Sequence, residues 1–500
     1  MFKSLMLDQY RSDFAEFHVA CAREHYLFNS GQKKTLEIAA IYERYSHLFD
    51  RDSIEKLRRE IKESSDHFQT QHVSIKRLLA FAVEQFLEDS AKRLTEEISQ
   101  SEAAATIEWM GREMTFQDST VAITAEPNRA ARRAIYARRL AVIEASNDLR
   151  AERLLKLHET ARSLKYTSYI ELFEQLRELN YSEIARQAAT LLSQTEGVYI
   201  TRLDELLKRN LGISVDEAER ADAMYLLHLT SFDDRFPSKE MLRVYNETMS
   251  GLGIRADAQT NIVIDSEPRP RKNARAFCAP ISIPDDVRLV IRPAGGQSDY
   301  QSLLHEAGHA QHYAWASAEL SPEFKYTGDY ALTETFAFLF NHLIFDADWL
   351  ATFLGITDSG NFIRSAVGAR LASVRRYAAK LMYERQLHAD EDLARSAQVY
   401  AELQTSATRF KTEPAGFLFD LDDSFYAASY LRAWALEVSL REHLKTRFGA
   451  RWWASRRAGD FLKEVWETGD RYTADEMAAQ IGIGPILFDP LIDEFNEALT

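Results

Sequence analysis

The sequence predicts a mainly α-helical protein with one small β element placed directly before one of its helices. Its 500 residues include only 19 glycines and 11 prolines, about half the usual combined share of roughly 12%. Because both residue types interrupt helices, this shortage predicts long helices. Apolar side chains also recur at helical spacing among charged ones, as in Ile75, Leu79, Val83, Phe86 and Leu94.

The first half of the chain carries this helical pattern almost without a break. Its amphipathic stretches are residues 5–30, 128–150, 150–178 and 182–210. We therefore expect a helical N-terminal region over residues 1–255.

The pattern changes near residue 260. Five of the eleven prolines fall between 268 and 293, and two stretches rich in β-branched residues, 261–264 and 287–291, predict strands there. Helical spacing then returns and continues almost to residue 500. The second predicted region, 256–500, therefore begins with a small sheet and is otherwise helical.

Composition restricts the class of protein. Lysine and arginine number 61 against 76 acidic residues, a net charge of −15, which disfavours binding to a phosphate backbone. No run of 18 apolar residues occurs, so we expect no membrane span. The two cysteines, Cys21 and Cys278, form no paired motif and fit a reducing compartment. These features predict a cytoplasmic protein that binds neither nucleic acid nor membranes.

The chemical signal lies in the helix that follows the small sheet, in the motif His-Glu-Ala-Gly-His. Ser298 has capping-box spacing and predicts a helix start near residue 299. His305 and His309 are four residues apart and share a helix face, as two ligands of Zn²⁺ require. Glu306 would lie beside the metal as a base rather than a ligand. The alternative is a pair of histidines with only a structural role.

A zinc site of this kind needs a third ligand. The position ten residues after His305 is Trp315, which excludes the class with a third histidine there. Glu334 is the best candidate, because most residues from 336 to 345 are apolar and a carboxylate at the start of a buried helix is costly unless paired or metal-bound. A solvated first-turn acid is the alternative for Glu334. Glu319 and Glu323 are rivals that lie too close behind the zinc helix.

The order and spacing of several segments resemble the thimet oligopeptidase and oligoendopeptidase F family of zinc peptidases. The matching segments are Ala276-Phe277-Cys278, Asp299, the run from His305 to His312, Glu334, and Phe425 to Tyr430. The resemblance implies a two-lobed helical metallopeptidase with a deep central channel, one wall of which residues 1–255 would form. It also implies one Zn²⁺ per chain and hydrolysis of internal bonds in short peptides, with folded proteins excluded from the channel.

Further residues are assigned roles as hypotheses. Zinc held by His305, His309 and Glu334 would make water acidic, and Glu306 would take the proton and return it to the leaving amine. Tyr426 and Tyr430 share a helix face and are candidate donors to the oxyanion. An ordinary packed aromatic pair is an equally good interpretation of these two tyrosines.

Substrate-binding roles are proposed for three parts of the sequence. If the strand at 287–291 is an edge strand, it can pair with an extended peptide, with Val287, Leu289 and Ile291 in the contact. Arg432 can bind a substrate carboxylate, although a solvated arginine is favoured. His312 lies nearly under His305 and can support the metal site, or it can be a plain surface histidine.

Two other functions remain open at this stage. A zinc carboxypeptidase or dipeptidyl carboxypeptidase would use the same site and would need a cation such as Arg432 to anchor the substrate's C-terminus. A catalytically idle peptide-binding scaffold is the alternative from another class, although an intact Glu306 beside both histidines argues against it.

Overall fold

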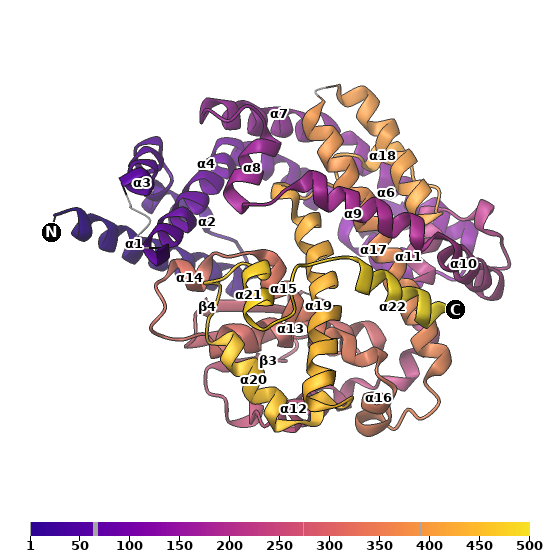
Figure 1. The fold of residues 1–500 in the computed structure, drawn as a ribbon. Coiled ribbons are helices and arrows are strands. Elements are labelled where there is room, and N and C mark those ends of the chain that lie inside the picture. Colours follow the sequence, from indigo (N-terminus) through magenta and orange to yellow (C-terminus); the bar gives the residue numbers. More distant parts are fainter. Residues whose placement is uncertain (1, 64–68, 274, 391) are drawn as a thin grey trace. The chain divides into compact units, whose positions relative to one another are not determined.

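The chain folds into a predominantly helical structure (Figure 1), which confirms the predicted fold class. The computed structural model describes residues 2–63, 69–273, 275–390 and 392–500. Among these residues, every helix is too short or too polar to cross a bilayer. The two-lobed body with a deep channel stays a prediction.

The helices have the following bounds. The first half of the chain contains α1 (Phe2–Asn29), α2 (Ile38–Arg44), α3 (Arg51–Glu63), α4 (Gln69–Ala104), α5 (Phe116–Ala125), α6 (Arg129–Ala145), α7 (Asn147–Ser163), α8 (Tyr169–Arg177), α9 (Tyr181–Gln194), α10 (Glu196–Leu211), α11 (Arg220–Leu226) and α12 (Met241–Gly251). The second half contains α13 (Gln297–Trp315), α14 (Glu323–Tyr326), α15 (Tyr330–Asn341), α16 (Ala347–Leu354), α17 (Gly360–Ala389), α18 (Leu393–Thr408), α19 (Tyr426–Phe448), α20 (Arg456–Trp466), α21 (Ala474–Gln480) and α22 (Asp489–Leu499).

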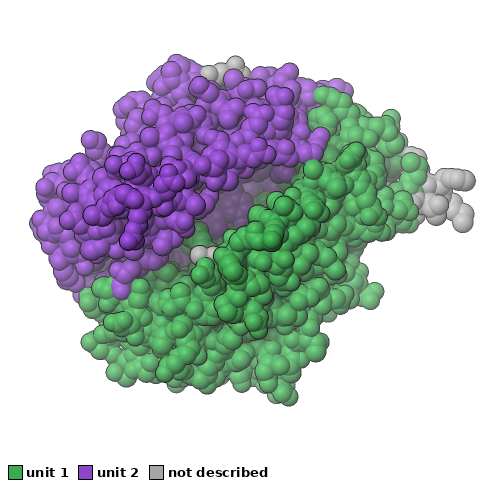
Figure 2. Space-filling model, turned by 180° about the vertical axis from the view of Figure 1, so that it is seen from behind, with its two compact units in different colours: residues 1–86, 231–363, 432–487 green, residues 87–230, 364–431, 488–500 purple. Residues whose placement is uncertain are grey.

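The chain divides into two compact units, coloured separately in Figure 2, and their residue ranges alternate along the sequence. Unit 1 comprises residues 1–86, 231–363 and 432–487, and unit 2 comprises residues 87–230, 364–431 and 488–500. Several boundaries fall inside helices, because α4, α17 and α19 each contribute residues to both units. The sequence analysis instead placed a single boundary near residue 255. That boundary remains a prediction about the domains.

The predicted small sheet lies in unit 1 and has three strands. They are β3 (Ile262–Asp265), β4 (Phe277–Ser282) and β5 (Asp286–Val290), in the order β3-β5-β4. Strand β5 pairs in parallel with β3 and antiparallel with β4. The sequence predicted β3 and β5 to within about one residue but did not predict β4.

The expectation that the strand at 287–291 lies at an edge is wrong. Because β5 is the middle strand, both of its edges already form backbone hydrogen bonds within the sheet. Val287, Leu289 and Ile291 are at most 1% exposed, so they belong to the core and are corrected from substrate-binding to structural residues. Strand β4 is the edge strand next to β5.

A second, two-stranded sheet in unit 2 was not predicted at all. Strands β1 (Thr106–Trp109) and β2 (Arg112–Thr115) form an antiparallel hairpin. Its two-residue turn, Met110-Gly111, has positive φ at both positions, the backbone that tight hairpins favour. Strands of four residues within a helical pattern leave little signal in the sequence.

Candidate metal centre

The site is built where α13 crosses α15 in unit 1. Gly308, in the middle of α13, allows this close approach, because a Cβ atom there would lie 2.4 Å from the carbonyl oxygen of Phe336. The apolar side of α15 is buried, and Phe340 packs against Trp452 and Trp466. This packing fixes the positions of both helices independently of the side chains of the site.

Helix α13 begins earlier than its sequence predicts. Its first residue is Gln297, and Ser298 does not cap it. Asp233 accepts a hydrogen bond from the Gln297 N–H at 3.0 Å, while Asp299 accepts from the backbone of Ala294 and Gly295 at 2.7 and 2.8 Å. The cap therefore comes from a residue far away in the sequence, which local spacing could not reveal.

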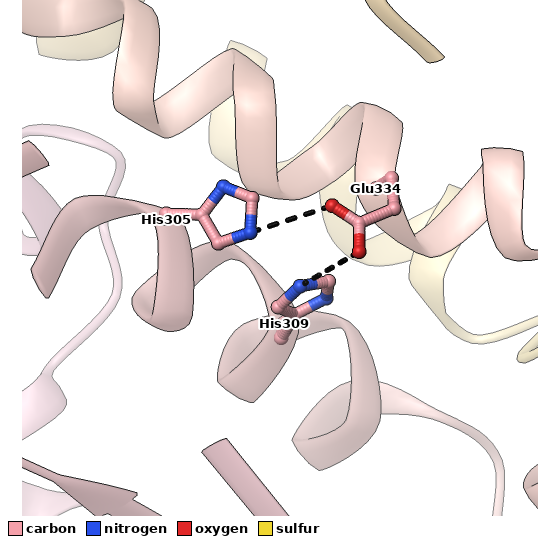
Figure 3. A group of neighbouring side chains, drawn as sticks. All are labelled: His305, His309 and Glu334. Atoms are coloured by element: carbon pink, nitrogen blue, oxygen red, sulfur yellow. Dashed lines mark ion pairs between the residues drawn. The ribbon is translucent and has the colours of Figure 1, made fainter. Parts of the chain in front are cut away.

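Three side chains from these two helices converge, as Figure 3 shows. His305 and His309 point from α13 towards Glu334 on α15, with Nε2–carboxylate distances of 3.3 and 3.7 Å. One ligand-type atom from each residue lies within 4.8 Å of the others. Among the described residues, this is the one group of three His, Cys, Asp or Glu side chains that meets such a criterion. The predicted trio is thus brought together.

The surroundings act differently on the two imidazoles. Burial lowers the pKa of His309 below its ordinary value. Burial also acts to lower the pKa of His305, but the hydrogen bond and the charge of Glu334 outweigh it and raise that pKa. Glu334 is only 4% exposed, so its carboxylate is largely removed from water. The solvated alternative for Glu334 is therefore wrong.

The hydroxyl of Thr333 orients His309. Thr333 Oγ1 lies 2.8 Å from His309 Nδ1 and donates its single hydrogen to Tyr313 Oη at 3.3 Å. Thr333 can therefore only accept from His309, which places the ring proton on Nδ1. The lone pair of a neutral His309 then lies on Nε2, the atom that faces Glu334.

Glu306 is held by the edge strand of the sheet. The backbone N–H of Cys278, in β4, donates to Glu306 Oε2 at 2.8 Å. This contact ties the carboxylate to the backbone of β4, which is itself fixed by pairing with β5. Glu306 also directly follows His305 on α13. One contact thus joins the edge strand to the motif.

The rival carboxylates are placed elsewhere. Glu323 is fully buried, but it pairs with Arg11 at 3.0 Å and also contacts Ser74. Glu319 is exposed. Neither belongs to the trio of His305, His309 and Glu334.

Arg432 is not a solvated arginine, nor does it hold its guanidinium ready for a substrate. It is 4% exposed and donates to both carboxylate oxygens of Asp329 at 3.0 and 2.9 Å. It also bonds to Asp475 at 2.5 Å. Asp329 in turn caps α15 through the Ala331 N–H. Arg432 therefore secures the start of the helix that carries Glu334, and its assignment as a substrate-binding residue is corrected.

His312 is buried rather than on the surface. It is 1% exposed, and burial lowers its pKa to about 4. Its Nε2 lies 3.3 Å from the carbonyl oxygen of Gly469, and its ring packs against Phe336 with 4.9 Å between ring centroids. His312 thus packs α13 against Phe336 of α15. Glu334 lies two residues before Phe336 on the same helix. A contact with substrate remains only a prediction.

Tyr426 and Tyr430 belong to unit 2. Their rings pack edge to face with centroids 5.0 Å apart, and Tyr430 also packs against Tyr377 at 5.0 Å. Both rings are half-buried. The two tyrosines therefore form a packed aromatic pair, as their spacing of four residues on a helix favours. Their part in catalysis stays a prediction.

Sequence reasoning missed the residues that support the trio. Thr333 and Asp329 stand next to the motif in space, yet their roles depend on His309 and on Arg432, which are 24 and 103 positions away. The only local signal was the Asp-x-Ala spacing at the start of α15, which is an ordinary N-cap pattern.

Comparison with known proteins supports the same fold. No protein-family profile matches the chain, and no curated protein matches it in sequence. Many solved structures share its fold, and three of them serve as examples. A Bacillus anthracis str. Ames protein described as an oligoendopeptidase F is 14% identical, with a TM-score of 0.62 over 96% of this chain and 94% of the other.

Two more of the matching structures are similarly distant in sequence. PZ peptidase A, in a structure with an inhibitor, is 15% identical with a TM-score of 0.67, over 96% of this chain and 88% of the other. A second protein described as an oligoendopeptidase F is 15% identical with a TM-score of 0.68, over 96% and 89% of the two chains. The chain therefore has the helical fold of oligoendopeptidase F and PZ peptidase A. The resemblance noted in the sequence is confirmed at the level of fold.

Proposed function

We propose that the protein is a zinc-dependent oligopeptidase that hydrolyses internal bonds of short peptides. One observation carries the proposal: His305, His309 and Glu334 converge within 4.8 Å, next to Glu306. The fold shared with peptidases supports the same reaction class.

The donor set fits a zinc ion. Two neutral imidazole nitrogens and one carboxylate are the ligands of a well-known type of catalytic zinc site, which keeps one position open. Zn²⁺ in such a site supplies Lewis-acid chemistry, by polarising a carbonyl and by making water acidic near neutral pH. The hydrogen bond from His309 to Thr333 leaves Nε2 available as the ligand atom.

Glu306 is the proposed general base and then the general acid. Its position next to His305 on α13 puts its carboxylate beside the trio, and the Cys278 N–H holds one of its oxygens. The carboxylate can accept a proton from the attacking water and deliver it to the leaving amine. It is not needed as a ligand, because Glu334 occupies that role.

The peptide is proposed to bind along β4. This strand lies at the edge of the described sheet and carries the Cys278 backbone that contacts Glu306. An extended peptide can add to such an edge through main-chain hydrogen bonds, with little dependence on its sequence. Tyr426 and Tyr430 are the proposed donors to the oxyanion, a contribution of about 2.7–4 kcal/mol per donor in other enzymes.

The ion pairs of Arg432 disfavour a carboxypeptidase function. The cation that Arg432 was expected to supply is already paired with Asp329 and Asp475. Removal of that pairing to bind a substrate carboxylate would leave two acids without their partner.

The test is a digest of a mixed peptide pool, followed by mass spectrometry. We expect the zinc-loaded protein to cut short peptides internally and Glu306→Gln to cut none of them. The matched control is Glu319→Gln, an exposed acid just beyond the same helix, which should behave as the wild type. Trimming only from the C-terminus would support the carboxypeptidase instead. Zinc content near zero after incubation with excess metal, with no cleavage, would support the idle scaffold.

A further inference from the structure

A cavity of about 130 Å³ lies beside the metal centre, entirely within unit 1. Its walls come from α1, β4, α13, α14 and α15 and from the turn after α20. The residues that matter to the argument are His18, Pro280, Tyr313, Tyr326, Thr333 and Asp470. Tyr330 also lines it and is 38% exposed, so the cavity reaches the molecular surface.

The cavity shares its walls with the catalytic elements. Thr333, which orients His309, forms part of one wall, and Tyr313 lies one turn after His309 on α13. Pro280 lies on β4, two residues after Cys278, whose N–H holds Glu306. A peptide paired with β4 would therefore run from Glu306 towards the cavity.

Asp470 gives this cavity a buried acid. It is 7% exposed, and its Oδ1 is buried without a hydrogen-bond partner in the described part of the chain. The residue is fixed by its backbone, because its N–H donates to the Phe324 carbonyl at 2.8 Å. Gly328 packs so closely that a Cβ there would lie 2.5 Å from Asp470 Cβ.

Among the described residues, none forms a close ion pair with Asp470 Oδ1. Arg77 on α4 favours the charged carboxylate and Asp329 opposes it, while burial dominates and raises the Asp470 pKa to about 7. Lys325 lines the cavity but donates to the Ala318 carbonyl at 2.7 Å. His18 is kept neutral, because burial lowers its pKa to about 3.

The other ionisable groups in the walls are Asp329, which is paired with Arg432, and several phenols. Burial raises the pKa values of Tyr313 and Tyr326 above their ordinary value, so both stay uncharged near neutral pH. Tyr326 also stacks on His18 with ring centroids 5.2 Å apart. The cavity thus combines aromatic walls with two carboxylates: Asp329 is paired with Arg432, whereas Asp470 has a buried oxygen without a partner among the described residues.

We propose that this cavity is a specificity subsite that accepts a lysine or arginine side chain of the substrate, with Asp470 as its anionic partner. The proposal rests on the proposed peptidase function and names a substrate class for it. The aliphatic stem of the substrate side chain packs against Tyr313 and Tyr326, and its charged end pairs with Asp470.

A cation is favoured over an apolar side chain for an electrostatic reason. An apolar occupant would remove the remaining water from Asp470 and leave its oxygen unpaired, which is costly for a buried carboxylate. A lysine or arginine supplies both the charge and the hydrogen bonds that the buried oxygen lacks. The cavity therefore selects by charge as well as by size.

The test compares two sets of peptides that are identical except for one residue near the scissile bond, lysine in one set and the uncharged isostere norleucine in the other. The position is varied on both sides of the bond. We expect wild-type kcat/KM to favour lysine at one position by at least about tenfold. Asp470→Asn should remove this preference, by lowering kcat/KM for the lysine peptide relative to kcat/KM for the norleucine peptide.

Two further variants separate charge from space. Ala22→Leu fills the cavity from α1 and should reduce cleavage of both peptides at the same position, with Asp470 unchanged. Asp460→Asn, at a side chain 53% exposed and paired with Lys463, is the matched control and should keep the lysine preference. The wild-type preference should also grow from about pH 6 to about pH 8, as Asp470 loses its proton.

The outcomes distinguish this proposal from the proposed function. If the wild type cleaves both peptides equally at every position, the peptidase function stands and the subsite is wrong. If the wild type cleaves neither peptide, calorimetric binding of the two peptides to Glu306→Gln decides: preferential binding of the lysine peptide supports the subsite, and equal or absent binding overturns it. Should Asp470→Asn fail to fold, the wild-type preference and the Ala22→Leu result still decide the matter.

Discussion

Asp470 leads to a prediction about stability that needs no substrate. Burial raises its pKa from 3.8 to about 7 in the folded protein, whereas the unfolded chain keeps the ordinary value. Between these values the folded state holds a proton that the unfolded state has released. Stability from this group is therefore fully present below about pH 3.8 and is lost as pH rises through about 7.

The magnitude follows from the pKa difference. At 1.36 kcal/mol per pKa unit, the total is about 4 kcal/mol, of which about 2 kcal/mol is lost between about pH 5.5 and about pH 8. Asparagine at this position has no proton to lose. Relative to the wild type, Asp470→Asn should therefore gain about 2 kcal/mol in its free energy of unfolding over this pH range.

The assay is urea unfolding of metal-free protein, followed by tryptophan fluorescence. Six of the seven tryptophans lie in unit 1, and Trp109 alone lies outside it, so the signal reports on the unit that contains Asp470. Asp460→Asn is the control and should show no such pH-dependent gain. A constant difference between Asp470→Asn and the wild type across the pH range would refute the reasoning that Asp470 is a buried acid with a strongly raised pKa.

Three further substitutions test the architecture of the site. Gly308→Ala should lower the free energy of unfolding by about 1–3 kcal/mol, because the added methyl group forces α13 away from α15; thermal unfolding measures this, and an unchanged melting temperature would contradict the close crossing. Thr333→Val should weaken zinc affinity by roughly 10–100-fold through loss of the hydrogen bond to His309; competition with a chelator measures it, and wild-type affinity would rule out an orienting role. Arg432→Gln should cost about 3–5 kcal/mol of stability, because it leaves Asp329 buried without its partner, while the positions of peptide cleavage stay the same; a switch in cleavage position would restore Arg432 as a substrate anchor.

The features that could be predicted from the sequence depend on local spacing. Two histidines four residues apart on one helix face are fixed by helix geometry alone, and the apolar stretch after Glu334 predicts the burial of that carboxylate. The β-branched stretches likewise predict β3 and β5. In each case the residues that decide the outcome are neighbours in the chain.

The features that could not be predicted depend on distant partners. Nothing in residues 287–291 reveals that β4 pairs with the far edge of β5, because strand order is a property of the whole sheet. Arg432 looks like a solvated cation until Asp329, about 100 residues earlier, is placed beside it. The cap of α13 comes from Asp233 for the same reason. Tertiary contacts, rather than local preference, set these outcomes.

Two acids near the start of α15 show how similar residues acquire different roles. Asp329 is paired on both oxygens with Arg432 and accepts two backbone N–H groups, so its charge is compensated within the fold. Asp470 is at least as deeply buried, but its Oδ1 has no partner among the described residues and borders a cavity that reaches the surface. When the protein compensates a buried charge, the cost of its desolvation is offset within the fold, whereas a charge that is not compensated raises the free energy of the unliganded state. A cationic ligand can recover that free energy on binding, and this is the physical basis for expecting selectivity at Asp470 and not at Asp329.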